Sequence, residues 1–245
     1  MWRSVALAVL AAVLAAVLAA VLTASPSRAE DPVVFDLSIR GIRAGTLSFS
    51  GEAAAGRYAV SGWLESTGLV GLVRQVRYDG QAEGSLRQGR FTPARYREQA
   101  DTGKRQSESV MEYRRGVPQV KVYTPPRDLG SDGVDPATQG GTVDPLTALF
   151  ATLRDVPPGE ECNRTLTLFD GKRRSQIVLG TPAAVEGGLA CPGEYRRLAG
   201  FSADDMAEKT RFPFTVRLVP GASGLMQVDE VTMESIYGNA RLKRR

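Results

Sequence analysis

The stretch FDLSIRGIRAGTLSFSG, residues 35–51, decides the fold class. Its apolar Phe35, Leu37 and Ile39 alternate with polar residues, and TLSFS in its second half alternates in the same way. This period of two is typical of a strand with one face buried and the other in water. The glycines of GIRAG, between the two halves, supply turn or bulge residues, so the stretch predicts a first hairpin.

The same alternation continues along the rest of the chain. Turn residues separate further strands at Gln88-Gly89, at Gly116 and at Asp170-Gly171, a dipeptide that tolerates the positive φ angles of a type I′ turn. RFPFTVRLVP and its return strand form another hairpin near the C-terminus. The pattern predicts a mainly β protein with about ten antiparallel strands, either in one strongly curved sheet or in a partly open β-barrel.

VDPLTALFATLRDVPPG, residues 143–159, breaks the alternation and predicts a helix. Asp144 is a suitable N-cap, and Pro145 fits the first helical position. Apolar residues then recur at helical spacing, at Leu146, Leu149, Phe150 and Leu153. Because such a stripe needs a large apolar partner, we expect the helix to cover the concave side of the sheet. Asp144 is interpreted as a cap, with a catalytic acid as the alternative.

Two other segments depart from the strand pattern. TGLVGLVRQV predicts a short helical turn over one end of the sheet. The stretch from Pro125 to Val143 has no periodicity, and loops of this length are usually functional or disordered. Disorder or a solvated crossover is one interpretation of this loop, and a mobile lid is the other.

The first 29 residues have the pattern of a secretory signal peptide. Arg3 precedes an apolar run over residues 5–22, and Ser27 and Ala29 occupy the small positions that a signal peptidase recognises. We predict cleavage after Ala29 and a periplasmic location. The run is long enough to span a bilayer, so an uncleaved anchor is the alternative. No cysteine lies near the cleavage point to carry a lipid, so we expect no stable membrane anchor after cleavage.

The remaining chain, residues 30–245, is predicted to form a single β-rich domain. The full chain has 31 Lys and Arg against 27 Asp and Glu, and removal of Arg3 and Arg28 with the signal leaves 29 against 27. A nucleic-acid-binding protein usually carries a concentrated basic face, so we expect no nucleic acid partner. Short basic runs do occur, at residues 172–174 and at the C-terminus, where ARLKRR either is solvated or meets anionic lipid.

Cys162 and Cys191 are the two cysteines of the chain. An even pair in an exported protein predicts a disulfide bond, because the compartment is oxidising. Two buried free thiols are the alternative.

The chain has no histidine, which removes the Ser-His-Asp triad, the Cys-His pair and every zinc site that needs histidine. No P-loop, GxSxG or suitably placed GxGxxG is present. Acidic pairs occur at Glu160-Glu161, Asp204-Asp205 and Asp229-Glu230, and a weak calcium pattern at Asp128, Asp132 and Asp135 lacks the EF-hand spacing. We therefore predict no catalytic residues, no metal and no cofactor, with polar turns and loops as the role of these acids.

The combination and order of several segments resemble a known family. These are FDLSIRGIRAGTLSFSG, STGLVGLVRQV, VDPLTALFATLR, NRTLTLFDGKRRSQIVL after Cys162, and the Cys191 strand that runs into LAGF. Together they resemble the DUF3108 family of exported bacterial proteins of unknown function, over residues 35–236. The resemblance implies a periplasmic protein with a strongly curved antiparallel sheet and a helical cover, similar in architecture to the lipoprotein carriers of the outer-membrane sorting pathway. It implies no catalytic residues.

A sheet that curls around an apolar helix can leave a cavity where the two do not fully meet. Our leading hypothesis is a non-catalytic periplasmic binding or carrier protein for a lipid or another apolar or amphipathic envelope molecule. The predicted ligand-binding residues are Leu69, Val70, Leu72, Val73, Leu146, Leu149, Phe150 and Leu153. Closure of the core by these same residues is the alternative for each. The competing functions are an envelope structural or interaction protein without a ligand, and a carboxylate-based enzyme acting on cell-wall glycan.

Overall fold

Fourteen strands form one antiparallel sheet in the computed structural model, which describes residues 32–68, 71, 75–126 and 132–245. All of its elements belong to the unit Asp31–Arg245. The strands are β1 (Val33–Ile39), β2 (Ile42–Ala54), β3 (Arg57–Ser66), β4 (Arg77–Arg87), β5 (Arg90–Asp101), β6 (Gln106–Arg114), β7 (Val117–Thr124), β8 (Arg164–Phe169), β9 (Arg174–Leu179), β10 (Ala183–Val185), β11 (Gly188–Ala199), β12 (Arg211–Pro220), β13 (Met226–Ser235) and β14 (Gly238–Arg244). The helices that lie wholly within the described residues are η1 (Pro136–Thr138), α3 (Pro145–Leu153) and α4 (Ala203–Glu208).

The strand order is β7-β6-β5-β4-β3-β2-β1-β14-β13-β12-β11-β9-β8, and β10 pairs with β11 beside this path. The predicted mainly β class is confirmed, and the sheet is open, with β7 and β8 at its edges. The expected strand number of ten is corrected to fourteen. Short β10 is too brief to show alternation, and glycines at positions 80 and 84 interrupt the apolar pattern of β4.

Tight turns of the form X-Gly set the register of the first hairpins. Arg40-Gly41, Ala55-Gly56, Gln88-Gly89 and Arg115-Gly116 all have positive φ at both residues, as a type I′ turn requires. The expected hairpin at Asp170-Gly171 is present, but its turn is longer than predicted. Residues 170–173 form it, and the Asp170 carboxylate accepts hydrogen bonds from two backbone N–H groups within the turn.

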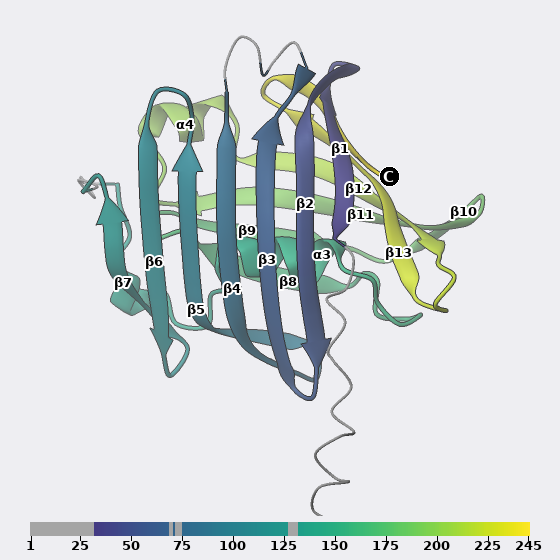
Figure 1. Ribbon diagram of the computed structural model, residues 1–245, viewed down its shortest axis with the longest axis horizontal. Helices are drawn as coiled ribbons and strands as arrows, with labels where there is room; N and C mark the ends of the chain where they lie inside the picture. The colour runs from purple at the N-terminus through teal and green to yellow at the C-terminus, as the bar shows by residue number, and fades with distance from the viewer. Residues whose placement is uncertain (1–31, 69–70, 72–74, 127–131) are drawn as a thin grey trace, which may run out of the picture. The chain divides into compact units, whose positions relative to one another are not determined.

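The sheet curls so that its two halves cross. In Figure 1 the strands β2–β6 run nearly vertically, while β8, β9, β11 and β12 cross behind them with α3 between the two groups. Helix α3 contacts β3, β4, β5 and β8. The N-cap Asp144 and the first-turn Pro145 have the predicted roles, and Leu153 ends the helix before the Pro157-Pro158 pair. The expectation of one helix on the concave side is thus confirmed, whereas α4 was not predicted.

The described part of the long loop, residues 132–143, is an ordered connection between the two sheet edges. The Gly141 N–H donates to the carbonyl of Gly116 in the β6–β7 turn. Two residues later, Val143 forms a parallel bridge with Leu168 of β8. Disorder is therefore wrong for these residues, because the β6–β7 turn and the open edge of β8 provide backbone partners for them, whereas a solvated crossover fits their position and their many exposed side chains.

An aromatic cluster packs between α3 and strands β2, β3 and β5 on the concave side of the sheet. Phe150 of α3 is almost fully buried and contacts the rings of Phe49, Tyr58 and Phe91, with centroid distances of 6.0, 6.4 and 6.1 Å. The predicted disulfide is confirmed: Cys162, before β8, is bonded to Cys191 of β11.

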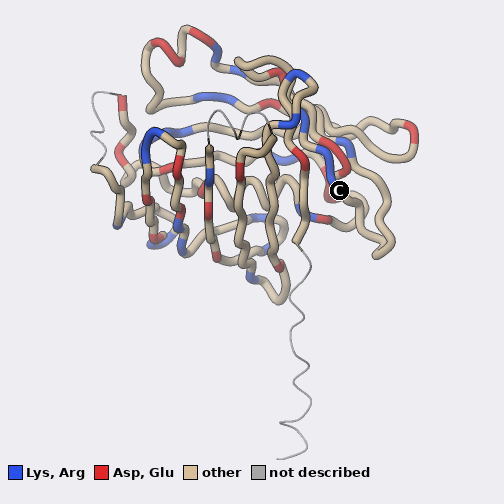
Figure 2. The backbone as a smooth tube through the Cα atoms, turned by 45° about the horizontal axis from the view of Figure 1, so that its top comes forward, with Lys and Arg blue, Asp and Glu red and all other residues tan. Residues whose placement is uncertain are grey.

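The basic C-terminal run is strand β14 and not a free tail. Each of its cationic side chains faces a carboxylate, in the pairs Arg241–Glu230, Lys243–Asp229, Arg244–Asp155 and Arg245–Asp36. Figure 2 shows basic and acidic residues side by side around the C-terminus. The sequence interpretations, a solvated tail or a tail that meets anionic lipid, both assumed unpaired charges and are therefore corrected. Pairing with β1 and β13 places this run among acidic neighbours.

Candidate functional site

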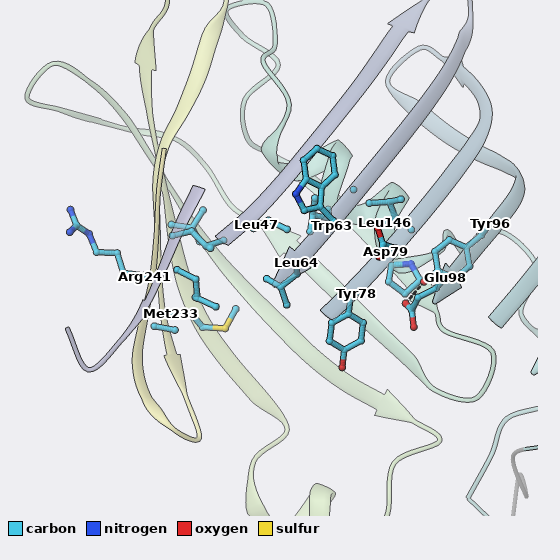
Figure 3. A pocket seen from close by; sticks show the side chains of 18 residues that line it. Leu47, Trp63, Leu64, Tyr78, Asp79, Tyr96, Glu98, Leu146, Met233 and Arg241 are labelled. Atoms are coloured by element: carbon cyan, nitrogen blue, oxygen red, sulfur yellow. Dashed lines mark hydrogen bonds between the residues drawn. The ribbon is translucent and has the colours of Figure 1, made fainter. Parts of the chain in front are cut away.

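An apolar cavity of about 450 Å³ lies between α3 and one end of strands β1–β5, β13 and β14 (Figure 3). It is open to solvent on one side, and its lining surface is almost wholly apolar. The lining residues are Leu37, Leu47, Gly62, Trp63, Leu64, Tyr78, Asp79, Gly80, Tyr96, Glu98, Pro145, Leu146, Leu149, Val231, Met233, Ala240, Arg241 and Leu242.

The floor of the cavity is the first half of α3. Leu146 and Leu149 are half-buried and line it, while the remaining apolar face of the helix is packed into the core. Leu146 rests on two glycines that pair across β3 and β4: a Cβ at Gly62 or Gly80 would come within 2.8 or 3.2 Å of its methyl groups. The glycines therefore let the helix approach the sheet closely at this point.

The walls are built by strand alternation. Leu47, Leu64 and Val231 belong to partly or fully buried positions packed around the core, and their polar neighbours along each strand alternate to the other face. Arg241 illustrates that outer face, since it pairs with Glu230 and extends away from the other lining side chains in Figure 3. The space enclosed by the walls is consequently apolar.

A hydrogen-bonded pair of polar side chains lies at the edge of this apolar lining. The Tyr96 hydroxyl donates a hydrogen bond to the carboxylate of Glu98, two residues further along β5 (Figure 3). Burial, followed by the negative charge of Glu98, raises the pKa of Tyr96 well above its ordinary value, so this hydroxyl keeps its proton. The cavity thus combines a large apolar surface with a fixed polar pair at its edge.

A second polar network lies under the start of the helix. The fully buried Asp144 carboxylate accepts hydrogen bonds from the Thr147 backbone N–H, at 2.8 Å, and from its hydroxyl, at 2.6 Å. Thr147 Oγ1 is also 2.8 Å from the Tyr58 hydroxyl. Burial raises the pKa of Asp144 to about 6, although its hydrogen bonds to Thr147 oppose this shift. These contacts fix the helix N-terminus, and with it the cavity floor.

The structure separates the predicted ligand-binding residues into three groups. Leu146 and Leu149 line the cavity. Phe150 and Leu153 do not: they are 2 % and 5 % exposed and close the core, because they lie on the helix face turned toward the aromatic cluster. Leu69, Val70, Leu72 and Val73 lie outside the described residues.

Other candidate groups identified in the sequence lie away from the cavity. None of the acidic pairs at positions 160–161, 204–205 and 229–230 lines it, and Asp135 caps η1. Asp128 lies outside the described residues. In the described part of the chain, no group of three acidic or cysteine side chains is arranged to hold a metal ion. No helix among those residues is both long and apolar enough to cross a bilayer.

Sequence reasoning did not single out most of the wall. Tyr78, Tyr96 and Glu98 come from strands with many charged residues, and Met233 and Leu242 come from the opposite end of the chain. The sequence signal for these residues was the alternation of Tyr78, Gly80 and Ala82 in β4. This alternation predicts which side chains point inward, but it does not predict that a cavity lies there.

The fold and the cavity together define the class of protein: an open, barrel-like antiparallel sheet that holds an apolar cavity over an internal helix. The chain belongs to the DUF3108 family, described as a protein of unknown function, whose family model matches residues 34–184. This match is shorter than the resemblance traced over residues 35–236, and it ends before the strands that contribute Val231, Met233 and Leu242 to the cavity.

Among solved structures, the chain is similar to the crystal structure of a β-barrel-like protein of the domain of unknown function DUF1849 from Brucella abortus. The two share 15 % sequence identity with a TM-score of 0.48, and the similarity covers 87 % of this chain and 95 % of that one. None of the curated proteins compared with the chain matches it.

Proposed function

We propose that the protein binds an apolar or amphipathic molecule in the cavity above α3, as a non-catalytic binding or carrier protein of the periplasm. The observation that carries this proposal is the cavity itself. Its volume of about 450 Å³ falls within the range of small-molecule sites, about 300 to 1,000 Å³, and its lining is apolar with few polar groups.

The chemistry of the lining favours one kind of ligand. The leucines at positions 37, 47, 64, 146 and 149 remove apolar surface from water, which favours an acyl chain or a small apolar ring system. The Tyr96–Glu98 pair offers an oxygen acceptor at the edge of the lining. An amphipathic ligand with a hydroxyl or amine group would place its apolar part over α3 and its polar group beside Glu98. The periplasm, which the signal sequence predicts, is a compartment in which envelope lipids need such shielding in transit.

Mass spectrometry of the protein purified from the periplasm tests the proposal directly. The protein is sprayed under native conditions and then extracted with organic solvent. We expect a stoichiometric adduct that the extraction removes, and we expect Leu149→Glu to lose it, because a charged side chain on the cavity floor would be left without a partner.

Two further variants separate binding from folding. Ala240→Leu fills the cavity from its wall with apolar volume and should also exclude the adduct, while Val185→Glu, on the exposed strand β10, should retain it. Circular dichroism confirms that each variant is folded. An adduct-free mass, combined with no saturable uptake of a fluorescent fatty acid by the wild-type protein, would overturn the proposal.

A further inference from the structure

A group of exposed apolar side chains lies where two hairpin turns meet at one end of the strands. Ile42, Ile236 and Tyr237 are 53, 39 and 66 % exposed. They come from the ends of two neighbouring hairpins, the β1–β2 hairpin and the β13–β14 hairpin. We call these three residues the apolar tip.

Backbone pairing holds the two parts of the apolar tip together. The Arg40 N–H donates to the Asn239 carbonyl at 2.8 Å, which joins the two turns. Ile39, the strand residue before Arg40, is in register both with Ile42 and with Ala240. The two turns that carry the apolar tip are therefore held side by side.

The hairpins that carry the apolar tip also contribute to the cavity wall. Met233 and Ala240 form a register pair in the cavity wall, and Ser235 and Gly238, which hold the turn of Ile236 and Tyr237, are the next inward-facing pair along the same ladder. Leu37, another wall residue, lies two positions before Ile39. Figure 1 shows both hairpin ends at the upper edge of the sheet. The tip thus lies beside the end of the sheet that contains the cavity.

Positive charge accompanies this tip. Arg40 in the β1–β2 turn and Arg43 near the start of β2 are exposed, and the Lys209 ammonium donates a hydrogen bond to the Glu234 carbonyl near the end of β13. Arg43 pairs with Asp36, but no carboxylate of the described residues lies within ion-pair distance of Arg40. This differs from β14, where every cationic side chain has an acidic partner.

We propose that the apolar tip inserts into the interface of an anionic lipid bilayer, with Arg40 facing the headgroups. Tyr and Ile on a protruding turn suit the boundary between headgroups and acyl chains, and a cation beside them is attracted by anionic lipid. A stable protein interface buries about 800 Å² on each partner, which three exposed side chains do not provide. Contact with the bilayer would bring the cavity wall formed by β13 and β14 close to the lipid. The membrane contact does not require a ligand in the cavity, so a failure of ligand binding would not contradict it.

Flotation of the purified protein with vesicles tests this proposal. Vesicles of phosphatidylglycerol and phosphatidylethanolamine are compared with vesicles of phosphatidylcholine alone, at low and high salt. We expect binding to the anionic vesicles that weakens at high salt. The double variant Ile236→Ser with Tyr237→Ser should lose most of this binding. Arg40→Asn should weaken it about five-fold, and asparagine tolerates the positive φ of this turn.

Val185→Ser is the matched control, because Val185 is 40 % exposed, close to the 39 % of Ile236, but lies on β10. It should bind as the wild type does. Unchanged binding by the double variant, or no binding of the wild type to anionic vesicles, overturns the proposal. Sedimentation velocity covers the remaining case: a wild-type dimer that the double variant converts to a monomer would assign the surface to a second copy of the chain and would also overturn it.

Discussion

Gly62 of β3 lies directly against Leu146 of α3, so that a Cβ atom at Gly62 would come within 2.8 Å of Leu146 Cδ1. The atom it meets is the end of a flexible side chain, and the space beside that side chain is the cavity. The same close approach that seats the helix therefore determines how much of the cavity is open.

Gly62→Ala should reduce ligand binding without reducing stability. The new methyl group turns Leu146 into the cavity, while alanine removes the extra backbone freedom of glycine in a strand, which favours folding by up to about 1 kcal/mol. Urea unfolding and titration with a fluorescent fatty acid measure the two effects on the same preparation.

Gly84→Ala is the contrasting variant. A Cβ at Gly84 would lie 2.3 Å from the carbonyl oxygen of Thr92, and a backbone atom cannot turn aside as Leu146 can. We expect a loss of about 1 to 3 kcal/mol from this overpacking. Equal destabilisation by both alanine variants would show that Leu146 has no room to move.

The buried Asp144 predicts an unusual pH dependence. Its pKa in the folded protein is about 6, above the ordinary value of 3.8, so its contribution to stability is complete below pH 3.8 and is lost as the pH rises through 6. Across that interval the loss amounts to about 3 kcal/mol. Asp144→Asn keeps an acceptor for the Thr147 N–H and cannot ionise, so the variant should gain stability relative to the wild type as the pH rises from 4 to 7.

Urea unfolding of both proteins at a series of pH values gives this difference directly. Other carboxylates, such as Asp36 and Asp229, have lowered pKa values and act in the opposite direction, but their effect is common to both proteins and cancels. A constant difference in unfolding free energy from pH 4 to 7 would contradict the raised pKa of Asp144.

The disulfide should stabilise the second half of the sheet. It joins residues separated by 29 positions, and closing such a loop contributes about 3 to 4 kcal/mol in the chain-entropy model. Replacing both Cys162 and Cys191 by serine should lower the urea midpoint and raise the slope, because the unfolded chain without the closed loop exposes more surface. Reduction of the wild type by dithiothreitol is the companion measurement, and a midpoint unchanged by both treatments would contradict the expected contribution.

Local features of this fold were predictable from the sequence because neighbouring residues determine them. X-Gly turns such as Gln88-Gly89 have one favoured geometry, and Asp144-Pro145 followed by an apolar stripe specifies a helix start. Helix α4 was missed although Ser202 and Asp205 form its capping contact, because its six residues carry no apolar face.

The cavity was predictable in kind but not in composition. Leu146 and Leu149 follow from the helix stripe, but their partners depend on how the sheet curls. Leu37 and Leu242, at opposite ends of the sequence, are register partners in the wall. The C-terminal basic run was misread for the same reason, since Asp155, the partner of Arg244, lies 89 residues away.

That last pair gives a final prediction. Arg244 of β14 pairs with Asp155, which follows α3, and the two side chains are only 19 % and 22 % exposed. Asp155 also accepts a hydrogen bond from Gln227 of β13, so the pair connects the segment that follows α3 to the wall strands β13 and β14.

Arg244→Ala should lower the free energy of unfolding by about 2 kcal/mol, as for other charge-assisted hydrogen bonds shielded from water. Arg241→Ala breaks a pair on the outer face whose arginine is 52 % exposed, and it should cost less than about 1 kcal/mol. Urea unfolding at low and high salt distinguishes the two, because screening should weaken the exposed pair more than the half-buried one. If both variants lose the same free energy of unfolding, Arg244 acts as an ordinary surface charge. Packing alone then holds the segment after α3 against strands β13 and β14.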